Sequence, residues 1–353
     1  MYGYKCPNCT ADLRFDSEKQ LLVCDFCDSE FEVELMRELG EEQAAGSEEN
    51  VNTDDFGKYD NEQWSDGALN VCPSCGAEIV SDGLSAVTKC PFCSNTAFIK
   101  KNLTGVYRPD CVIPFEISLE EATEALCRFA KRKPLLPKNF IGEIKRTETQ
   151  GLYVPFWLYD CDSDAHITYR ATRVHTWEDS RYVYTKTDHY FVVRDGAMSF
   201  DMIPADGSSK MNDDIMEAIE PYDKSKLADF DSAYLSGYLA DKYDVSAQDN
   251  KERICSRISN TVRSEFLNTV IGYTTVRKSS ESIRVNDRRV RYALLPVWVL
   301  DYNYKGKRYT YTVNGQSGRV AGELPVSWGR FFAWLAGISA GVFAILSLCV
   351  GFA

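Results

Sequence analysis

Histidines and common catalytic motifs are scarce in this sequence. It contains no glycine-rich phosphate loop, no Gly-x-Ser-x-Gly elbow and no His-Glu-x-x-His motif. Its three histidines lie in a region rich in strand-forming residues, near several aspartates but without a cysteine or glutamate at ligand spacing. We therefore expect surface or core roles for them rather than a metal site, and we predict that the protein is not an enzyme. The histidines are His166, His175 and His189.

A surplus of positive charge is also absent. The chain has 40 Lys and Arg against 52 Asp and Glu, a formal net charge of -12. Lys and Arg counted against Asp and Glu give -5 for residues 1–35, -8 for 36–69, +1 for 70–101 and 0 for 102–353. A non-specific nucleic-acid binder needs a basic surface to replace counterions on phosphate, so we do not expect nucleic acid as a partner. Segment 36–69 is predicted to be a solvated acidic linker. The alternative is an acidic segment that binds a basic partner.

The N-terminus lacks an apolar segment, whereas the C-terminus has a long one. The first residues, MYGYKCPNC, contain no hydrophobic region of a secretory signal. Residues 331–353 carry no charged side chain and would form a helix of about 34 Å, against about 30 Å for a bilayer's hydrocarbon core. We predict a single transmembrane helix here, with a buried helix of a soluble protein as the alternative. Arg319 and Arg330 precede it, which favours a tail-anchored protein with its N-terminal domains in the cytoplasm.

Small residues recur within this predicted span. Gly337 and Gly341 form a small-xxx-small step, with Ala333 four residues earlier. Such faces let helices approach one another closely. The span is therefore a candidate for homo- or hetero-oligomer contacts through the two glycines.

Cysteine is concentrated near the N-terminus. Eight of the 13 cysteines form four Cys-x-x-Cys pairs before residue 94, and each set of two pairs has the same 14-residue gap. A tight turn aims two thiolates at one ion, and a hairpin returns a second turn to complete a tetrahedron, which predicts two structural zinc ions and a reducing compartment. A rubredoxin-like iron site and a redox motif are weaker alternatives. The predicted ligands are Cys6, Cys9, Cys24 and Cys27 in the first set, and Cys72, Cys75, Cys90 and Cys93 in the second.

Beyond residue 101 the sequence is typical of a folded α+β domain. Pro155-Phe156-Trp157 recurs as Pro296-Val297-Trp298, and each copy is followed by a β-prone run. Both segments are apolar at successive positions, so both faces should be covered. Ser118 and Glu121 form a capping box ahead of a predicted helix.

The predicted fold class is multidomain: two small four-cysteine zinc ribbons, a β-rich, internally duplicated α+β cytoplasmic domain and one C-terminal transmembrane helix. The predicted boundaries are 1–35 for ribbon 1, 36–69 for the acidic linker, 70–101 for ribbon 2, 102–326 for the α+β domain and 331–353 for the transmembrane helix. Within the α+β domain we predict two related Pro-x-Trp strand modules and a helical insert.

The two CPxC/CxxFC ribbons, the PFWLYD and PVWVLD segments, the NGQSGRVAGELP stretch and the apolar tail together resemble a family of bacterial membrane proteins described as TFIIB-type zinc ribbon-containing proteins. The resemblance covers nearly the whole chain. It implies membrane-anchored accessory factors, associated by gene neighbourhood with SPFH or virion-core-like proteins and with envelope-stress complexes. Some members are labelled primosomal helicases, but this sequence has no nucleotide-binding loop.

These features favour a non-enzymatic adaptor that binds protein partners at the cytoplasmic face of the membrane. Two alternatives stay open at this point. One is nucleic-acid binding by the ribbons, and the other is an enzyme of unknown reaction in the β-rich domain.

Overall fold

The computed structural model describes the chain except for residues 1–5, 7–12, 26, 28, 34–58, 65–67, 82–88, 104, 138–139, 145–148, 305–306 and 352–353. Most of the predicted acidic linker therefore lies outside the described residues. The described strands are β1 (Arg14–Asp16), β2 (Leu21–Val23), β3 (Glu30–Phe31), β4 (Ala68–Val71), β5 (Glu78–Ser81), β6 (Ile99–Asn102), β7 (Cys111–Val112), β8 (Thr149–Glu178), β9 (Val183–Asp206), β10 (Ala228–Asp229), β11 (Leu239–Asp241), β12 (Thr275–Tyr304), β13 (Lys307–Asn314) and β14 (Val320–Gly322). The helices are α2 (Leu119–Lys131), α3 (Phe140–Ile144), α4 (Asp213–Ala218), η1 (Lys224–Lys226), η2 (Ser232–Leu235), α5 (Lys251–Asn268) and α6 (Trp328–Gly351).

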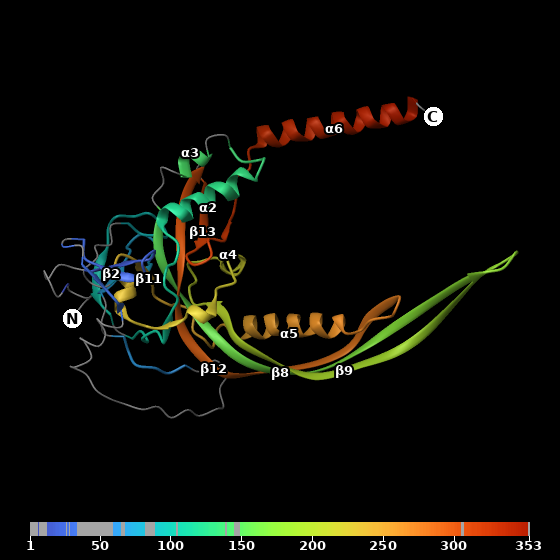
Figure 1. Ribbon diagram of the computed structural model, residues 1–353, viewed down its shortest axis with the longest axis horizontal. Helices are drawn as coiled ribbons and strands as arrows, with labels where there is room; N and C mark the ends of the chain where they lie inside the picture. The colour runs from blue at the N-terminus through green and yellow to red at the C-terminus, as the bar shows by residue number, and fades with distance from the viewer. Residues whose placement is uncertain are drawn as a thin grey trace.

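Two long antiparallel strands, β8 and β12, form the centre of an 11-stranded sheet (Figure 1). The sheet follows the order β10-β7-β12-β8-β11-β5-β4-β6, while β9 adds to β8, and β13 and β14 extend from β12. The two Pro-x-Trp segments lie on adjacent strands but are offset, because Trp157 pairs with Tyr292 and Pro296 pairs with Tyr153. The repeated segments are thus neighbours in one sheet. The expectation of a β-rich domain is confirmed.

Both faces of β8 and β12 are buried where the two Pro-x-Trp segments lie, as the apolar pattern predicts. Odd-numbered β8 residues such as Tyr153 and Trp157 pack into the larger core on one face. Even-numbered residues such as Phe156 pack against the opposite core, which includes Met216 and Ile219 from the α4 region. Because side chains alternate along a strand, a segment covered on both faces has to be apolar at every position.

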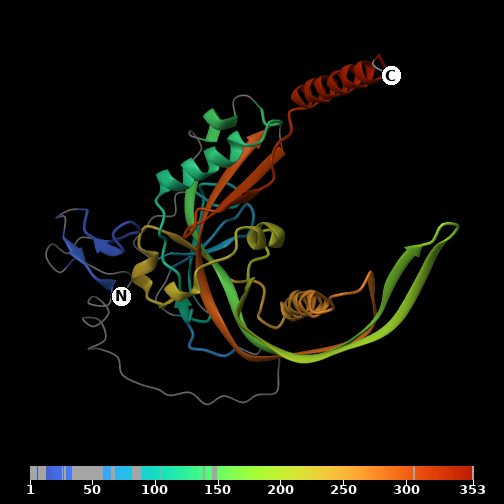
Figure 2. The same cartoon turned by 45° about the vertical axis from the view of Figure 1, so that its right-hand side comes forward.

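The helices cover particular parts of the sheet. The Ser118 hydroxyl accepts a hydrogen bond from the Glu121 N–H, and the Glu121 carboxylate accepts one from the Ser118 N–H, so the predicted capping box of α2 is confirmed. Helix α5 buries Ile254, Ile258 and Val262. Figures 1 and 2 show α5 on the inner side of the curve formed by β8, β9 and β12.

Residues 59–64, which the charge pattern assigns to the end of the acidic linker, pack against the folded domain. The Trp64 side chain is only 3% exposed, and its backbone N–H donates to the carbonyl of Val106 at 2.7 Å. The Tyr59 hydroxyl donates to the Asp110 carboxylate at 3.0 Å. Two aromatic side chains thus bring this end of an otherwise acidic segment onto the domain, since burying a large ring outweighs the cost of ordering a few residues.

Helix α6 runs from Trp328 to Gly351 and projects away from the sheet (Figures 1 and 2). Among the described residues, no helix meets the combined length and hydropathy expected of a membrane span. The environment of side chains 344–353 lies outside the described residues, so the span predicted over 331–353 stays a prediction. A Cβ atom added at Gly337 or Gly341 would meet no other atom within 4 Å, and the predicted helix contact there likewise stays a prediction.

Candidate metal centre

The second cysteine set lies on two similar turns. Cys72 follows β4 directly, and its N–H donates to the Ala77 carbonyl at 2.9 Å. The Cys90 N–H makes the equivalent bond to the Asn95 carbonyl at 2.8 Å. The residue four positions after the first cysteine has a positive φ in both turns, +72° at Gly76 and +61° at Ser94. This left-handed residue closes each turn, and glycine occupies it without steric cost.

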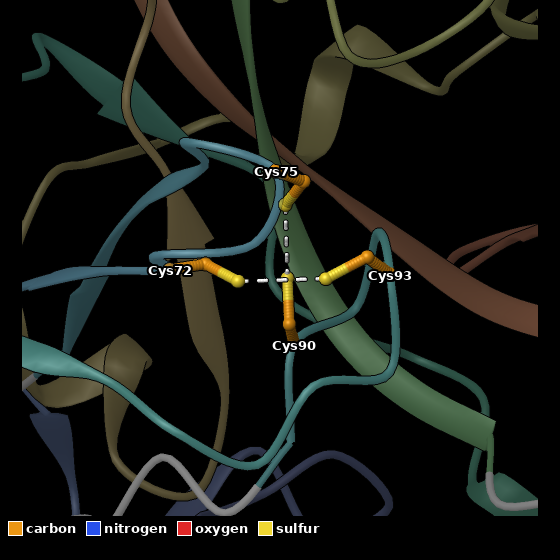
Figure 3. Close-up of side chains that lie close together, drawn as sticks. All are labelled: Cys72, Cys75, Cys90 and Cys93. Atoms are coloured by element: carbon orange, nitrogen blue, oxygen red, sulfur yellow. Dashed lines mark hydrogen bonds between the residues drawn. The ribbon is translucent and has the colours of Figure 1, made fainter.

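The four sulfurs of this set point toward one another (Figure 3). The Sγ atoms of Cys72 and Cys93 are 3.4 Å apart, and those of Cys75 and Cys90 are 3.6 Å apart. A disulfide would need about 2.05 Å. Four sulfurs at about 2.3 Å from a tetrahedral ion would be separated by about 3.8 Å. The described residues therefore form a group that could hold a metal ion.

Backbone groups also favour the ionised form of one ligand. Burial disfavours the Cys72 thiolate, but the N–H groups of Cys75 and Ser74 point at its sulfur and lower the pKa of Cys72 to about 6. Burial raises the pKa values of Cys75 and Cys90. Thiolates packed this closely in a buried place repel one another unless a cation lies among them.

Few apolar side chains surround this centre. Its core comprises Ala77 and Ile79 with partly buried Phe92, Phe98 and Leu239 around the cysteines. Such a small cluster contributes little to ordering the two cysteine turns, so a bound metal would supply much of the energy that holds these turns.

The second ribbon is joined to the main sheet by β11. Ala240 pairs with Val80 of β5 on one side and with Tyr153 of β8 on the other. The Lys242 ammonium lies 2.6 Å from the Glu78 carboxylate. The centre is thus attached through β11 to the strand that carries the first Pro-x-Trp segment. No usable pattern in the sequence marks this bridge, because β11 has only three residues.

The first cysteine set is described in part. Cys6, Cys24 and Cys27 form a second group that could hold a metal ion, with the Sγ atoms of Cys6 and Cys27 3.6 Å apart. Cys9 lies outside the described residues. The Cys24 N–H donates to the Ser29 carbonyl at 2.9 Å, which repeats the bond made by Cys72. The repeated spacing in the sequence is thus matched by a repeated local geometry.

The first ribbon also packs against the main domain. Phe15 is 1% exposed, its N–H donates to the Ser236 carbonyl at 3.1 Å, and its ring meets the Tyr234 ring edge-on at 5.0 Å. Beside this contact is a cavity of about 540 Å³, lined by β1, β11 and the N-terminal end of α2. No histidine lines it, and its charged groups are of both signs: Arg14, Asp16, Glu18, Lys89 and Glu120.

The three histidines are not brought together at a site. His166 contacts Asp195 at 2.9 Å, and His175 is 3.8 Å from Asp188, both as cross-strand neighbours of the β8–β9 hairpin. Their side chains are about half exposed. In the part of the chain that the structure describes, they belong to none of the groups able to hold a metal.

Comparison with known proteins gives a similarity along nearly the full length of the chain. The chain is 35% identical over 346 residues to a Bacillus subtilis (strain 168) protein, "Uncharacterized protein YdjG", and the match covers 98% of this chain and 96% of that protein. No family model matches the chain. No solved structure matches it either.

Proposed function

The chain belongs to the family of the Bacillus subtilis protein YdjG, and we propose that it is a membrane-anchored adaptor whose zinc ribbons bind protein partners at the cytoplasmic face. The observation that carries this proposal is the closed set of four sulfurs at Cys72, Cys75, Cys90 and Cys93. Four thiolates occupy all four coordination positions of a tetrahedral ion and leave none for a catalytic water. Zinc in this set stabilises a surface rather than performing a reaction, and a second zinc occupies the Cys6, Cys24 and Cys27 group.

The tail supports the membrane part of the proposal. Exposed apolar side chains lie along α6 and do not pack against the sheet domain. They are Trp328, Phe332, Trp334, Leu335, Ile338, Val342 and Phe343. An exposed apolar helix of this kind is stabilised by lipid. Thiolate zinc sites persist in a reducing compartment, which agrees with a cytoplasmic position of the ribbons.

The second ribbon offers an accessible surface for a partner. β6 forms one end of the main sheet order, and its Ile99 side chain is 53% exposed. Lys100 and Lys101 beside it are exposed as well. Among the described strands β6 pairs only with β4, and the open edge of a strand can accept a strand from another protein. The resemblance to the TFIIB-type family suggests membrane proteins of the SPFH or virion-core-like kind as partners.

We expect crosslinking of the full chain in native membranes to recover a specific partner, and the Cys72→Ser/Cys75→Ser variant to lose it. The reason is that loss of zinc removes the ordered ribbon surface. Recovery is measured by mass spectrometry after affinity purification. Ile99→Glu should lower recovery about tenfold or more while zinc stays bound, since burying a charge in an apolar contact costs several kcal/mol.

The matched control is Cys255→Ser, which removes a partly buried thiol on α5 outside both cysteine groups. It should recover the partner as the parent chain does. Equal recovery from the parent chain, Cys72→Ser/Cys75→Ser and Ile99→Glu would overturn the adaptor proposal. Recovery of nucleic acid in place of protein would favour the nucleic-acid alternative.

A further inference from the structure

The β8–β9 hairpin extends well past the other strands as a long arm (Figures 1 and 2). β12 pairs with β8 only as far as Thr172, so β8 residues 173–178 pair with β9 alone. Along its 24 residues β9 pairs only with β8 among the described strands, which leaves its outer edge open. An open edge presents unpaired N–H and C=O groups that can add another strand.

The outer part of β9 lacks two usual protections of an edge strand, proline and a bulge. Residues 183–194 contain no proline, and the irregularity in the β8–β9 pairing lies far from them, between Tyr159 and Cys161. Val183 and Phe191 are each 67% exposed. The segment is also rich in threonine, valine and aromatic residues, which favour strands. These properties suit an edge that is covered by another strand in the working protein.

We propose that residues 183–191 pair antiparallel with the same residues of a second copy, about a two-fold axis at Thr187. On one face this places Lys186 opposite the partner's Asp188 and Tyr184 opposite the partner's Tyr190. On the other face it places Val183 opposite the partner's Phe191. Opposite-charge, aromatic and apolar cross-strand pairs are the contacts that stabilise antiparallel strands.

The charges select this register over its neighbours. Residues that pair across a two-fold axis normal to the sheet must lie on the same face, so the two copies can shift along each other only by an even number of residues. A shift of two residues moves the axis by one residue. An axis at residue 186 would place Lys186 opposite the partner's Lys186. An axis at residue 188 would place Asp188 opposite the partner's Asp188. Directly opposed like charges destabilise a strand pair. Of these three axes, only the one at Thr187 places both Lys186 and Asp188 opposite a charge of the other sign.

The occupant is a second copy because the edge is complementary to itself. In one chain the Lys186 ammonium lies 2.9 Å from the Asp188 carboxylate, and the two side chains are 62% and 29% exposed. In the pair each of these charges gains an opposite charge from the partner subunit. A surface that matches itself under a two-fold rotation is the requirement for a closed dimer. This pairing is independent of the proposed zinc and adaptor functions.

The test is charge reversal in the full chain, purified in detergent and measured by sedimentation velocity over a concentration series. The parent chain should dimerise. Lys186→Glu and Asp188→Lys should each raise the dimer Kd about tenfold, because two attractive pairs become repulsive in each homodimer. An equimolar mixture of the two single variants should dimerise like the parent, since every opposed pair is then of opposite sign. The Lys186→Glu/Asp188→Lys double variant should also dimerise like the parent.

Arg277→Glu is the matched control, because Arg277 is an exposed residue of β12, away from the β9 edge. It should leave the dimer Kd unchanged. Recovery of dimers in the mixture shows that the single variants are folded. A parent chain that stays monomeric up to about 100 μM would overturn the proposal. Dimers that persist unchanged in both single variants, as contacts through α6 would give, would overturn it equally.

Discussion

Replacing Cys72 and Cys75 by serine should unfold the second ribbon and remove one of two zinc ions per chain. Structural zinc contributes about 10–16 kcal/mol of apparent binding free energy in small zinc-dependent folds, and the few apolar contacts around Ala77 and Ile79 cannot replace it. β5 also pairs with β11, but this pairing involves few residues, so we expect residues 70–101 to unfold locally. The β8–β12 pair should stay folded because its own ladder is long. The expected loss of local stability is about 5 kcal/mol or more.

Hydrogen exchange of the full chain measures this loss directly. Amides of β4, β5 and β6 should lose protection, whereas those of β8 and β12 should keep it. Cys255→Ser, the control for removal of a thiol, should retain both zinc ions and all protection. Unchanged protection of β4, β5 and β6 in the Cys72→Ser/Cys75→Ser variant would show that the metal does not stabilise this ribbon.

Trp157→Ala should reduce the free energy of unfolding of the main domain by about 3–5 kcal/mol. The Trp157 side chain is 2% exposed and lies against the rings of Tyr59, Tyr243 and Tyr292, with centroids 5.0, 5.3 and 5.2 Å away. Its indole N–H donates to the Val245 carbonyl at 2.9 Å. Truncation leaves a large cavity and removes this hydrogen bond, and it also removes a contact that holds Tyr59 on the domain.

The comparison variant is Trp177→Ala, near the tip of the arm. Trp177 is 53% exposed and stacks on Tyr184 at 5.6 Å, so its truncation should cost no more than about 1 kcal/mol. Both values come from chemical denaturation followed by far-UV circular dichroism. Equal costs for the two tryptophans would contradict the assignment of Trp157 to the centre of the core.

Features encoded by a few neighbouring residues were predictable from the sequence. The Cys-x-x-Cys spacing determines a turn, so the grouping of Cys72, Cys75, Cys90 and Cys93 could be anticipated. The Ser118–Glu121 capping box is equally local and begins α2 as expected. The apolar run around Trp157 required cover on both faces, and the structure provides it.

Features that depend on distant pairing were not predictable. The bridge between the second ribbon and β8 depends on Leu239–Asp241, a strand too short to produce a periodic pattern. The Pro-x-Trp repeat predicted two related modules, but it did not indicate that Trp157 and Trp298 lie on adjacent strands of one sheet. The docking of Tyr59 was not evident from the acidic composition around it, because its ring contacts with Tyr107, Trp157 and Tyr292 outweigh the average character of the segment.

The two proposed zinc sites are tested most directly by the metal that the full chain binds when it is purified without added metal. Elemental analysis with X-ray absorption should find two zinc ions per chain, each with four sulfur ligands at about 2.3 Å. Iron in place of zinc, a disulfide within either cysteine group, or a chain that is folded from residue 70 to 101 without metal would contradict the two zinc sites.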